Sequence, residues 1–425
     1  MRDTTATNSK EELAAIETIK KKLLGKQLSY KEIFNLMDEM STEKLSPILT
    51  TYFVAAGFNE GFTNTELFYL TKAMAETGKK LKFRGIVADK HSTGGLAGTR
   101  TTMILVPIIA SAGFCIPKNS SRAITTPAGT ADTMEVLAPV TLTAEKIKKI
   151  VDKIGGCIVW GGHLGIAPAD DVIIRVETPL RFESFDKVIV SIMAKKVASG
   201  ANHLILDIPV GPTLKVHRFK DADVIVKKFS YLARKFEMKL TVDVNQSLEP
   251  AGHAVGPSLE ARDVLKVLEQ RSDRPMVLEA KAIRLAGKLL DLCYLDTRKK
   301  ETESGEETAD RILKSGMAMH KMREIIKHQG GNPDITVEKI HIGKYRFEVA
   351  SSKKGTVCGF NNQDLTIISR ILGCPLDKKA GIHLEQRVDQ KVEKGDILCT
   401  LYASSKWHLE EAKETLKHVP IYRVE

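Results

Sequence analysis

The segment from Gly85 to Thr102 places a short apolar run, a loop with three glycines and the start of a helix in direct succession. Gly85 to Asp89 is apolar enough for a buried strand, and from Thr101 the apolar residues follow helical spacing. Glycines let a backbone approach an anion closely, and a helix start adds N–H groups. Side chains that can donate further hydrogen bonds are those of Lys90, Ser92, Thr99 and Thr102. We predict a phosphate-binding loop, with an ordinary tight strand-to-helix turn as the alternative.

The loop matches neither of the two common nucleotide-binding motifs. Its lysine precedes the glycines, whereas the lysine of G-x-x-x-x-G-K-[ST] follows them, and G-x-G-x-x-G is absent. No acidic residue is placed after the loop to bind a ribose. A dinucleotide-dependent oxidoreductase is therefore disfavoured.

The remaining pattern indicates a helical part followed by an α/β part. Four helices with short connections precede Gly78, two of them begun by capping boxes at Ser29–Glu32 and Thr63–Glu66. From Lys82 strands, loops and helices alternate, which is typical of a parallel sheet. After a second strand, at residues 114–117, comes a second loop rich in hydroxyls, 118–135. Such loops on neighbouring strands face one crevice, and a solvated surface loop is the alternative.

Composition narrows the class of protein. The net charge is +11, but the lysines are spread along amphipathic helices with acidic residues nearby. Aromatic residues make up 6% of the chain, too few for base-stacking platforms, so a non-catalytic nucleic-acid-binding protein is a distant alternative. No apolar run approaches the ~20 residues of a membrane span, and the N-terminus carries no secretory signal. We expect a cytoplasmic protein without nucleic-acid or membrane partners.

The six cysteines are isolated along the chain. They form no Cys-x-x-Cys and no cluster with zinc spacing. We expect buried thiols in a reducing compartment and no metal site.

Four short motifs occur in this order on that frame. They are Lys90-His-Ser-Thr-Gly-Gly95, Ser120-Ser-Arg122, Ala167-Pro-Ala-Asp170 and Ser191-Ile-Met-Ala-Lys-Lys196. The set resembles the thymidine/pyrimidine nucleoside phosphorylases, over nearly the whole chain. Within that family the sequence resembles most the type 2 thymidine phosphorylases and the related AMP phosphorylases, which share residues 120–125 and 128–135.

The resemblance implies a pentosyltransferase (a glycosyltransferase) of nucleotide salvage. Inorganic phosphate, a co-substrate, attacks the anomeric carbon of a nucleoside, and no cofactor is expected. Our first expectation is thymidine phosphorylase, which forms thymine and 2-deoxyribose 1-phosphate. Phosphorolysis of AMP or another nucleoside 5′-monophosphate is the alternative. Members of this kind are typically homodimers through the helical lobe.

Residue roles also follow from the resemblance. Phosphate contacts are implied for Lys90, Ser92, Gly94, Gly95, Thr102, Ser120 and Thr130. Base contacts are implied for Arg175, Ser191 and Lys195, the last two lying four apart on one predicted helix. The catalytic set is His91 near the sugar, Arg175, Lys195 and Glu183. Contacts to a nucleotide or its 5′-phosphate are implied for Ser121, Arg122 and Lys215.

Two differences favour the nucleoside over the nucleotide. Lys215 matches a nucleotide-binding lysine of the AMP phosphorylases, but Glu183 stands where their proposed acid is an aspartate. The AMP phosphorylases also carry a domain before the helical lobe, whereas this sequence starts at the lobe.

The architecture implied is a helical lobe, discontinuous in sequence, beside a larger α/β domain with a mixed sheet. We expect residues 1–78 and 166–200 in the lobe, and residues 79–165 and 201–335 in the α/β domain. The strand pattern beyond Pro333 predicts a small β-rich C-terminal cap with two helices, residues 336–425.

Overall fold

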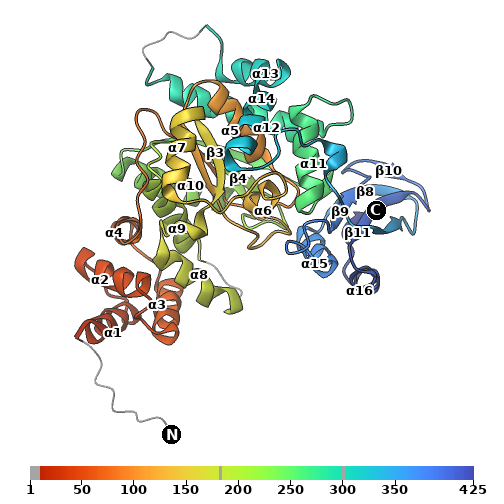
Figure 1. Ribbon diagram of the computed structural model, residues 1–425. Coiled ribbons are helices and arrows are strands. Elements are labelled where there is room, and N and C mark those ends of the chain that lie inside the picture. The colour runs from red at the N-terminus through yellow and green to blue at the C-terminus, as the bar shows by residue number, and fades with distance from the viewer. Residues whose placement is uncertain (1–9, 181–183, 298–301) are drawn as a thin grey trace. The chain divides into compact units, whose positions relative to one another are not determined.

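The computed structural model describes residues 10–180, 184–297 and 302–425 (Figure 1). These residues form two compact units, each built from separate stretches of the chain. The first unit comprises the described parts of Met1–Lys82, Gly161–Asn202 and Asp223–Lys239. The second comprises those of Phe83–Trp160, His203–Ala222 and Leu240–Glu425.

The first unit is a bundle of helices. Its members are α1 (Lys10–Leu23), α2 (Tyr30–Ser41), α3 (Pro47–Glu60), α4 (Asn64–Glu76), α8 (Pro168–Leu180), α9 (Phe185–Ala198) and most of α10 (Phe219–Lys235). The predicted capping boxes at Ser29 and Thr63 are present and begin α2 and α4. Apolar residues such as Leu36 and Leu67 point into the bundle and are fully buried. The four predicted N-terminal helices are therefore confirmed.

Parallel strands form the centre of the second unit. β1 (Ala88–Ser92), β4 (His203–Val210) and β5 (Lys239–Gln246) lie in the order β1-β4-β5, while β2 (Ile116–Ser120) pairs with β3 (Gly156–Trp160). β1 runs parallel to β4, with Ser92 opposite Asp207, and β2 runs parallel to β3. A bridge between Val87 and Cys115 links the two groups of strands. The predicted parallel arrangement is confirmed.

Two strand boundaries differ from the sequence prediction. The first strand spans Ala88–Ser92 rather than 85–89, so Lys90, His91 and Ser92 belong to the strand and not to the loop. The second spans Ile116–Ser120 rather than 114–117. Both strands continue into polar residues because their neighbouring strands keep pairing with them there. A prediction from apolar residues alone therefore ends such strands too early.

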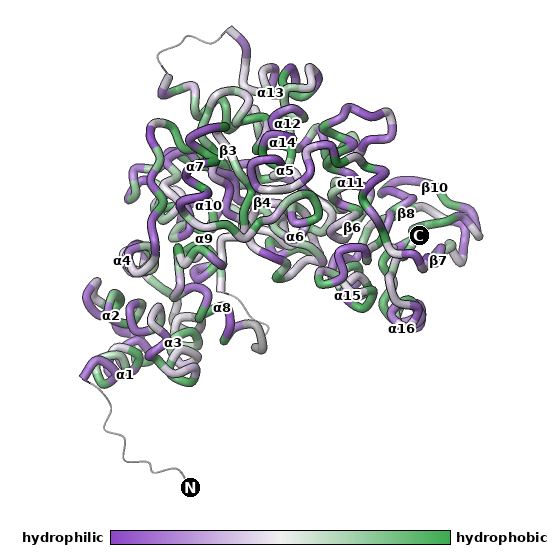
Figure 2. The backbone as a smooth tube through the Cα atoms, in the orientation of Figure 1, coloured by the Kyte–Doolittle hydropathy of each residue, from purple (hydrophilic) through white to green (hydrophobic). Residues whose placement is uncertain are grey.

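Helices pack around these strands. They are α5 (Thr101–Ser111), α6 (Thr130–Met134), α7 (Ala144–Ile154), α11 (Pro257–Leu268), α12 (Met276–Tyr294), α13 (Gly305–Lys314) and α14 (Met317–Gln329). α5 is buried along almost its whole length and contacts α12 and α14. Figure 2 shows hydrophobic residues gathered along β3 and β4 at the centre of this unit.

The C-terminal part of the second unit is rich in antiparallel strands. They are β7 (Tyr345–Ala350), β8 (Gly355–Phe360), β9 (Gly381–Leu384), β10 (Lys391–Val392), β11 (Ile397–Ala403) and β12 (Tyr422–Val424), with helices α15 (Asn362–Leu372) and α16 (Lys406–Leu416). β6 (Ala254–Val255) joins the sheet β6-β9-β11-β7, so the C-terminal sheet takes a strand from the α/β part. The strand-rich C-terminal segment with two helices is confirmed.

The described residues contain no helix that is long and apolar enough to cross a membrane. They include all six cysteines, which are free thiols, four of them buried and two half-buried.

Candidate active site

Lys90 lies on β1 beside the glycine loop, with only 4% of its side chain exposed. Its Nζ is 3.4 Å from Oδ2 of Asp207 and 3.3 Å from Oγ1 of Thr101, the first residue of α5. The Nζ of Lys281 lies 3.4 Å from Oδ1 of the same aspartate. Two buried lysines thus share one carboxylate, and this Lys90 cluster (Lys90, Asp207 and Lys281) has one positive charge in excess. A buried excess charge beside backbone N–H groups suits an anion.

The glycine loop follows β1 in an unusual backbone conformation. Gly94, Gly95 and Gly98 have φ values of +84°, +91° and +58°, in the region that favours glycine. A Cβ added at Gly95 would lie 3.1 Å from both the backbone N and the Cγ of Lys215. The structure therefore brings the predicted nucleotide contact, Lys215, directly against the predicted phosphate loop.

Lys215 stands in a short loop that its own backbone closes. The N–H of Gly211 donates to the carbonyl of Val216 over 3.0 Å, and that of Leu214 donates to the carbonyl of Gly211 over 3.1 Å. Val210 and Val216 form a parallel bridge. This loop holds the half-buried Lys215 in place beside Gly95.

The start of α5 connects the glycine loop to the second predicted loop. Arg100, which is nearly buried, donates from Nε to the carboxylate of Glu260. Its Nη1 lies 3.4 Å from Oγ1 of Thr130, the first residue of α6. Thr102 lies buried in the first turn of α5. Thr130 and the glycine loop thus share one end of the strand layer.

Arg122 is held within the second loop by ion pairs with two carboxylates. Its guanidinium donates to both carboxylate oxygens of Glu135, over 2.7 and 2.6 Å, and to Asp132 over 3.0 Å, while it lies 4.8 Å from the centre of the Trp160 ring. Asp132 also accepts the N–H of Gly129. Ser120 ends β2 and Ser121 is exposed just beyond it. A nucleotide contact by Arg122 or Ser121 stays a prediction.

A second polar cluster lies within the first unit. Asp170, fully buried on α8, accepts hydrogen bonds over 2.7 Å from both the Oγ of Ser191 and the Nζ of Lys195 on α9. Lys187, one turn earlier on α9, is 3.8 Å from the other carboxylate oxygen. The structure therefore brings the two predicted base contacts, Ser191 and Lys195, together on an aspartate that had been given no role. We call Asp170, Ser191 and Lys195 the Asp170 cluster.

Charge determines the protonation of this cluster. Burial alone would raise the pKa of Asp170, but Lys195 and Lys187 more than offset it, so the pKa is lowered. Burial alone would lower the pKa of Lys195, and Asp170 more than offsets that, so the pKa is raised. Asp170 and Lys195 therefore both stay charged. The side chain of Lys195 is 27% exposed, so a ligand can reach it.

Arg175 does not join this cluster. Its side chain is 64% exposed, and its guanidinium pairs with Glu43 over 2.9 Å. Residues five apart on a helix lie about 140° apart around its axis, so Arg175 and Asp170 face different directions. Glu177, seven residues after Asp170, shares its face and pairs with Lys187 over 2.6 Å. A base contact by Arg175 stays a prediction.

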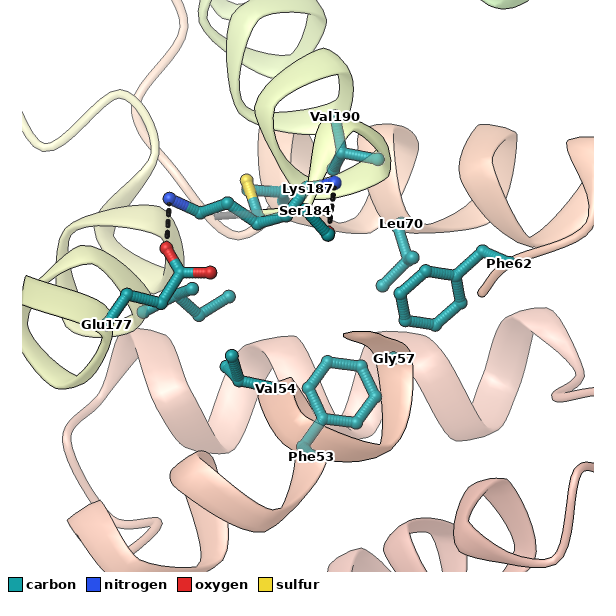
Figure 3. A pocket seen from close by; sticks show the side chains of 11 residues that line it. Phe53, Val54, Gly57, Phe62, Leu70, Glu177, Ser184, Lys187 and Val190 are labelled. Carbon is teal, nitrogen blue, oxygen red and sulfur yellow. Dashed lines mark hydrogen bonds and ion pairs between the residues drawn. The ribbon is translucent and has the colours of Figure 1, made fainter. Parts of the chain in front are cut away.

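An apolar hollow lies beside Lys187 in the same unit (Figure 3). Phe53 and Val54 of α3 line one side and Phe62 another, and the ion pair of Lys187 with Glu177 lies at its edge. The hollow adjoins Ser184, which caps α9.

Family comparisons cover most of the chain. Residues 16–78 match the family described as glycosyl transferase family, helical bundle domain. Residues 84–319 match the glycosyl transferase family, a/b domain, and residues 356–422 match the pyrimidine nucleoside phosphorylase C-terminal domain.

Individual relatives agree with these matches. The AMP phosphorylase of Thermofilum pendens is 44% identical over 95% of this chain and 77% of its own length. That of Methanocaldococcus jannaschii is 41% identical over 95% of this chain and 79% of its own length. A Legionella pneumophila protein named "Putative thymidine phosphorylase" is 39% identical over 95% of this chain and 77% of its own length. The chain belongs to the thymidine/pyrimidine nucleoside phosphorylase family.

The same family membership makes the chain a pentosyltransferase of the phosphorylase type. A solved structure supports the fold alone. Anthranilate phosphoribosyltransferase from Thermus thermophilus has a TM-score of 0.56 at 17% identity, covering 73% of this chain and 99% of that one.

The other two predicted catalytic residues are His91 and Glu183. His91 lies on β1, half-buried, between Lys90 and Ser92. Glu183 lies outside the described residues. Among the described residues there is no group of three or more His, Cys, Asp or Glu side chains that could hold a metal ion.

In a family that uses inorganic phosphate, the buried Lys90 predicts a pH dependence. Burial lowers the pKa of Lys90, and Lys281 and Arg100 act in the same direction against Asp207. Because the pKa is lowered, Lys90 loses its proton before pH reaches the ordinary lysine value of about 10.4. We expect the KM for phosphate to rise with pH below that value. Lys90→Arg, whose guanidinium stays charged, should flatten the profile. Superimposable profiles of wild type and variant would contradict this role.

Proposed function

We propose that the chain catalyses phosphorolysis of a nucleoside 5′-monophosphate, with AMP as the representative substrate. The phosphate oxygen forms a bond to C1′ while the bond from C1′ to the base nitrogen breaks. The base leaves with the electron pair and takes up a proton, and the sugar becomes a pentose 1,5-bisphosphate. The observation that carries the proposal is the contact of Lys215 with Gly95 in the glycine loop.

The charge requirement of such a reaction supports this proposal. A nucleotide substrate brings a second phosphate group near the co-substrate phosphate, and two like charges repel unless cations lie between or beside them. The Lys90 cluster supplies one excess positive charge, and the cation of Lys215 stands on a loop that packs against Gly95. A nucleoside alone would need only the first. The position of Lys215 is therefore better suited to a nucleotide.

The Asp170 cluster suits the departing base. Electron density builds up on the base as its bond to C1′ breaks, and a fixed cation stabilises that density more than it stabilises the ground state. Lys195 is held by Asp170, and Ser191 shares that carboxylate. The cluster thus provides an oriented cation and a hydroxyl that can contact base atoms.

Relatives lend further support to the nucleotide. The Thermofilum and Methanocaldococcus proteins are both named AMP phosphorylase. Chain length does not distinguish the two substrates. This chain covers the same share, 77%, of the Thermofilum AMP phosphorylase and of the Legionella protein named as a thymidine phosphorylase.

A substrate panel tests the proposal. Purified protein is incubated with AMP, CMP, adenosine, uridine or thymidine, with and without phosphate, and released base is measured. We expect phosphate-dependent release mainly from the monophosphates. Lys215→Ala should weaken their use by about ten- to a hundredfold, the size of a lost charge-assisted contact, and barely affect nucleosides. Lys220→Ala, which removes a nearby exposed lysine, is the matched control.

Thymidine phosphorolysis is the second candidate, favoured by the name of the Legionella relative. In that case thymidine would be the preferred substrate of the wild type. Lys215→Ala would then change neither nucleoside nor nucleotide use. This outcome would leave the phosphorolysis chemistry in place and overturn the proposed substrate.

The homodimer expected from the resemblance stays a prediction. Ile48 and Tyr52, four apart on α3, are 70% and 54% exposed, so apolar surface is available on the helical lobe. A dimer through this face would bury it.

A further inference from the structure

Asn362 reaches the glycine loop from a distant part of the sequence. It is the first residue of α15, and its side chain is buried with 6% exposure. Its Oδ1 accepts the N–H of Ala97 over 3.0 Å, and its Nδ2 donates to the carbonyl of Gly95. One carboxamide therefore bonds the peptide groups on both sides of Leu96.

The same part of the loop is also anchored by apolar packing. Ala97 is fully buried in the core of the C-terminal strands, together with Leu365 and Leu401. The backbone N of Asn362 comes within 3.5 Å of Oγ1 of Thr213, in the loop that carries Lys215. The start of α15 thus contacts both the glycine loop and the neighbouring lysine loop.

A loop with three glycines needs such a brace. Glycine residues have more backbone freedom than others, so an unbraced loop samples many conformations. Only the fraction that holds the binding conformation can take up a ligand, and the apparent dissociation constant rises as that fraction falls. The carboxamide of Asn362 matches a backbone carbonyl and N–H and removes that freedom around Leu96.

We infer that Asn362 is a positioning residue, which holds the glycine loop in its phosphate-binding conformation through Gly95 and Ala97. The inference rests on the proposed phosphorolysis. Because Asn362 acts through the loop, its loss lowers the fraction of protein ready to bind phosphate. Saturating phosphate refills that fraction. The expected signature is a raised KM for phosphate with little change in kcat.

The kinetic test compares neighbouring asparagines. Asn362→Ala should raise the KM for phosphate by about ten- to a hundredfold, with kcat at saturating phosphate within about twofold of wild type. Asn361 caps the same helix through the N–H groups of Gln363 and Asp364. Asn361→Ala should destabilise α15 and leave the KM for phosphate unchanged. Equal KM values in all three proteins, or equal increases in both variants, would overturn the inference.

A second measurement does not depend on activity. Amide hydrogen exchange should accelerate at residues 94–98 in Asn362→Ala and not in Asn361→Ala. If wild type releases no base from any substrate, the proposed function fails, and exchange still tests the brace. Where Asn362→Ala does not fold, Asn362→Asp keeps the volume and the acceptor but loses the donor to Gly95. The same acceleration is then expected, and wild-type exchange in that variant would overturn the inference.

Discussion

Replacing Gly95 by alanine is expected to lower kcat/KM for phosphorolysis by up to about a hundredfold. The backbone at Gly95 has φ +91°, where a side chain costs about 1–2 kcal/mol. The new Cβ would also lie 3.1 Å from the backbone N of Lys215. Either the glycine loop or the lysine loop must then give way by a few tenths of an ångström. A displacement of about 1 Å in groups that position a substrate can cost about a hundredfold in rate.

Two other glycines separate backbone strain from close contact. Gly113, after α5, has φ +92° and no heavy atom within 4 Å of an added Cβ. Gly113→Ala should therefore lower the melting temperature and leave the kinetics unchanged. Gly94 lies in the glycine loop itself, with φ +84° and likewise no heavy atom within 4 Å of an added Cβ. Gly94→Ala therefore strains the loop backbone without the close contact to Lys215. If Gly95→Ala kept wild-type kcat/KM, the contact between the two loops would have no part in catalysis.

Some features of the candidate active site could be predicted from short stretches of sequence, because neighbouring residues alone form them. The three glycines of the loop lie at positive φ. The helix α5 begins at Thr101, as the spacing of apolar residues predicted. Ser191 and Lys195, four apart, do share one face of α9 and one partner. Each of these features depends on a few consecutive residues and on helix or turn geometry.

Partners from distant parts of the chain were not predictable in this way. Asp207 and Lys281 meet Lys90 through β4 and α12, and Asn362 reaches Gly95 from α15. Nothing in a single sequence indicates which buried carboxylate will neutralise which lysine. Helical geometry could have predicted which residues share a face of α8. Asp170 and Glu177 are seven apart and must share a face of α8, whereas Arg175 must not.

The strand error has the same origin. A polar stretch such as Lys90-His-Ser92 is predicted to be a loop when strands are assigned from apolar residues alone. It forms strand because β4 continues beside it to Asp207. The buried charges are tolerated there since Lys90 and Asp207 pair. Charged and polar residues at a strand end therefore leave no hydrophobic periodicity from which the strand could be predicted.

Lys195→Ala is expected to lower kcat/KM about a hundred- to a thousandfold, the usual effect of removing one donor that stabilises developing charge. The variant also leaves Asp170 buried with Lys187 at 3.8 Å as its nearest cation. Without Lys195 the pKa of Asp170 should rise, because burial then outweighs the remaining attraction. Breaking such a buried pair costs about 3–5 kcal/mol of stability. Loss of activity and loss of stability must therefore be separated.

The double variant Lys195→Ala/Asp170→Asn makes that separation. It removes the unpaired charge along with the lysine, and the amide can still accept the hydrogen bond of Ser191. We expect the free energy of unfolding to recover most of its loss while kcat/KM stays low, because the base still lacks its cation. Both quantities are measured for wild type, the two single variants and the double variant. If turnover returned with stability, Lys195 would act only by neutralising Asp170, and its assignment to the base would be wrong.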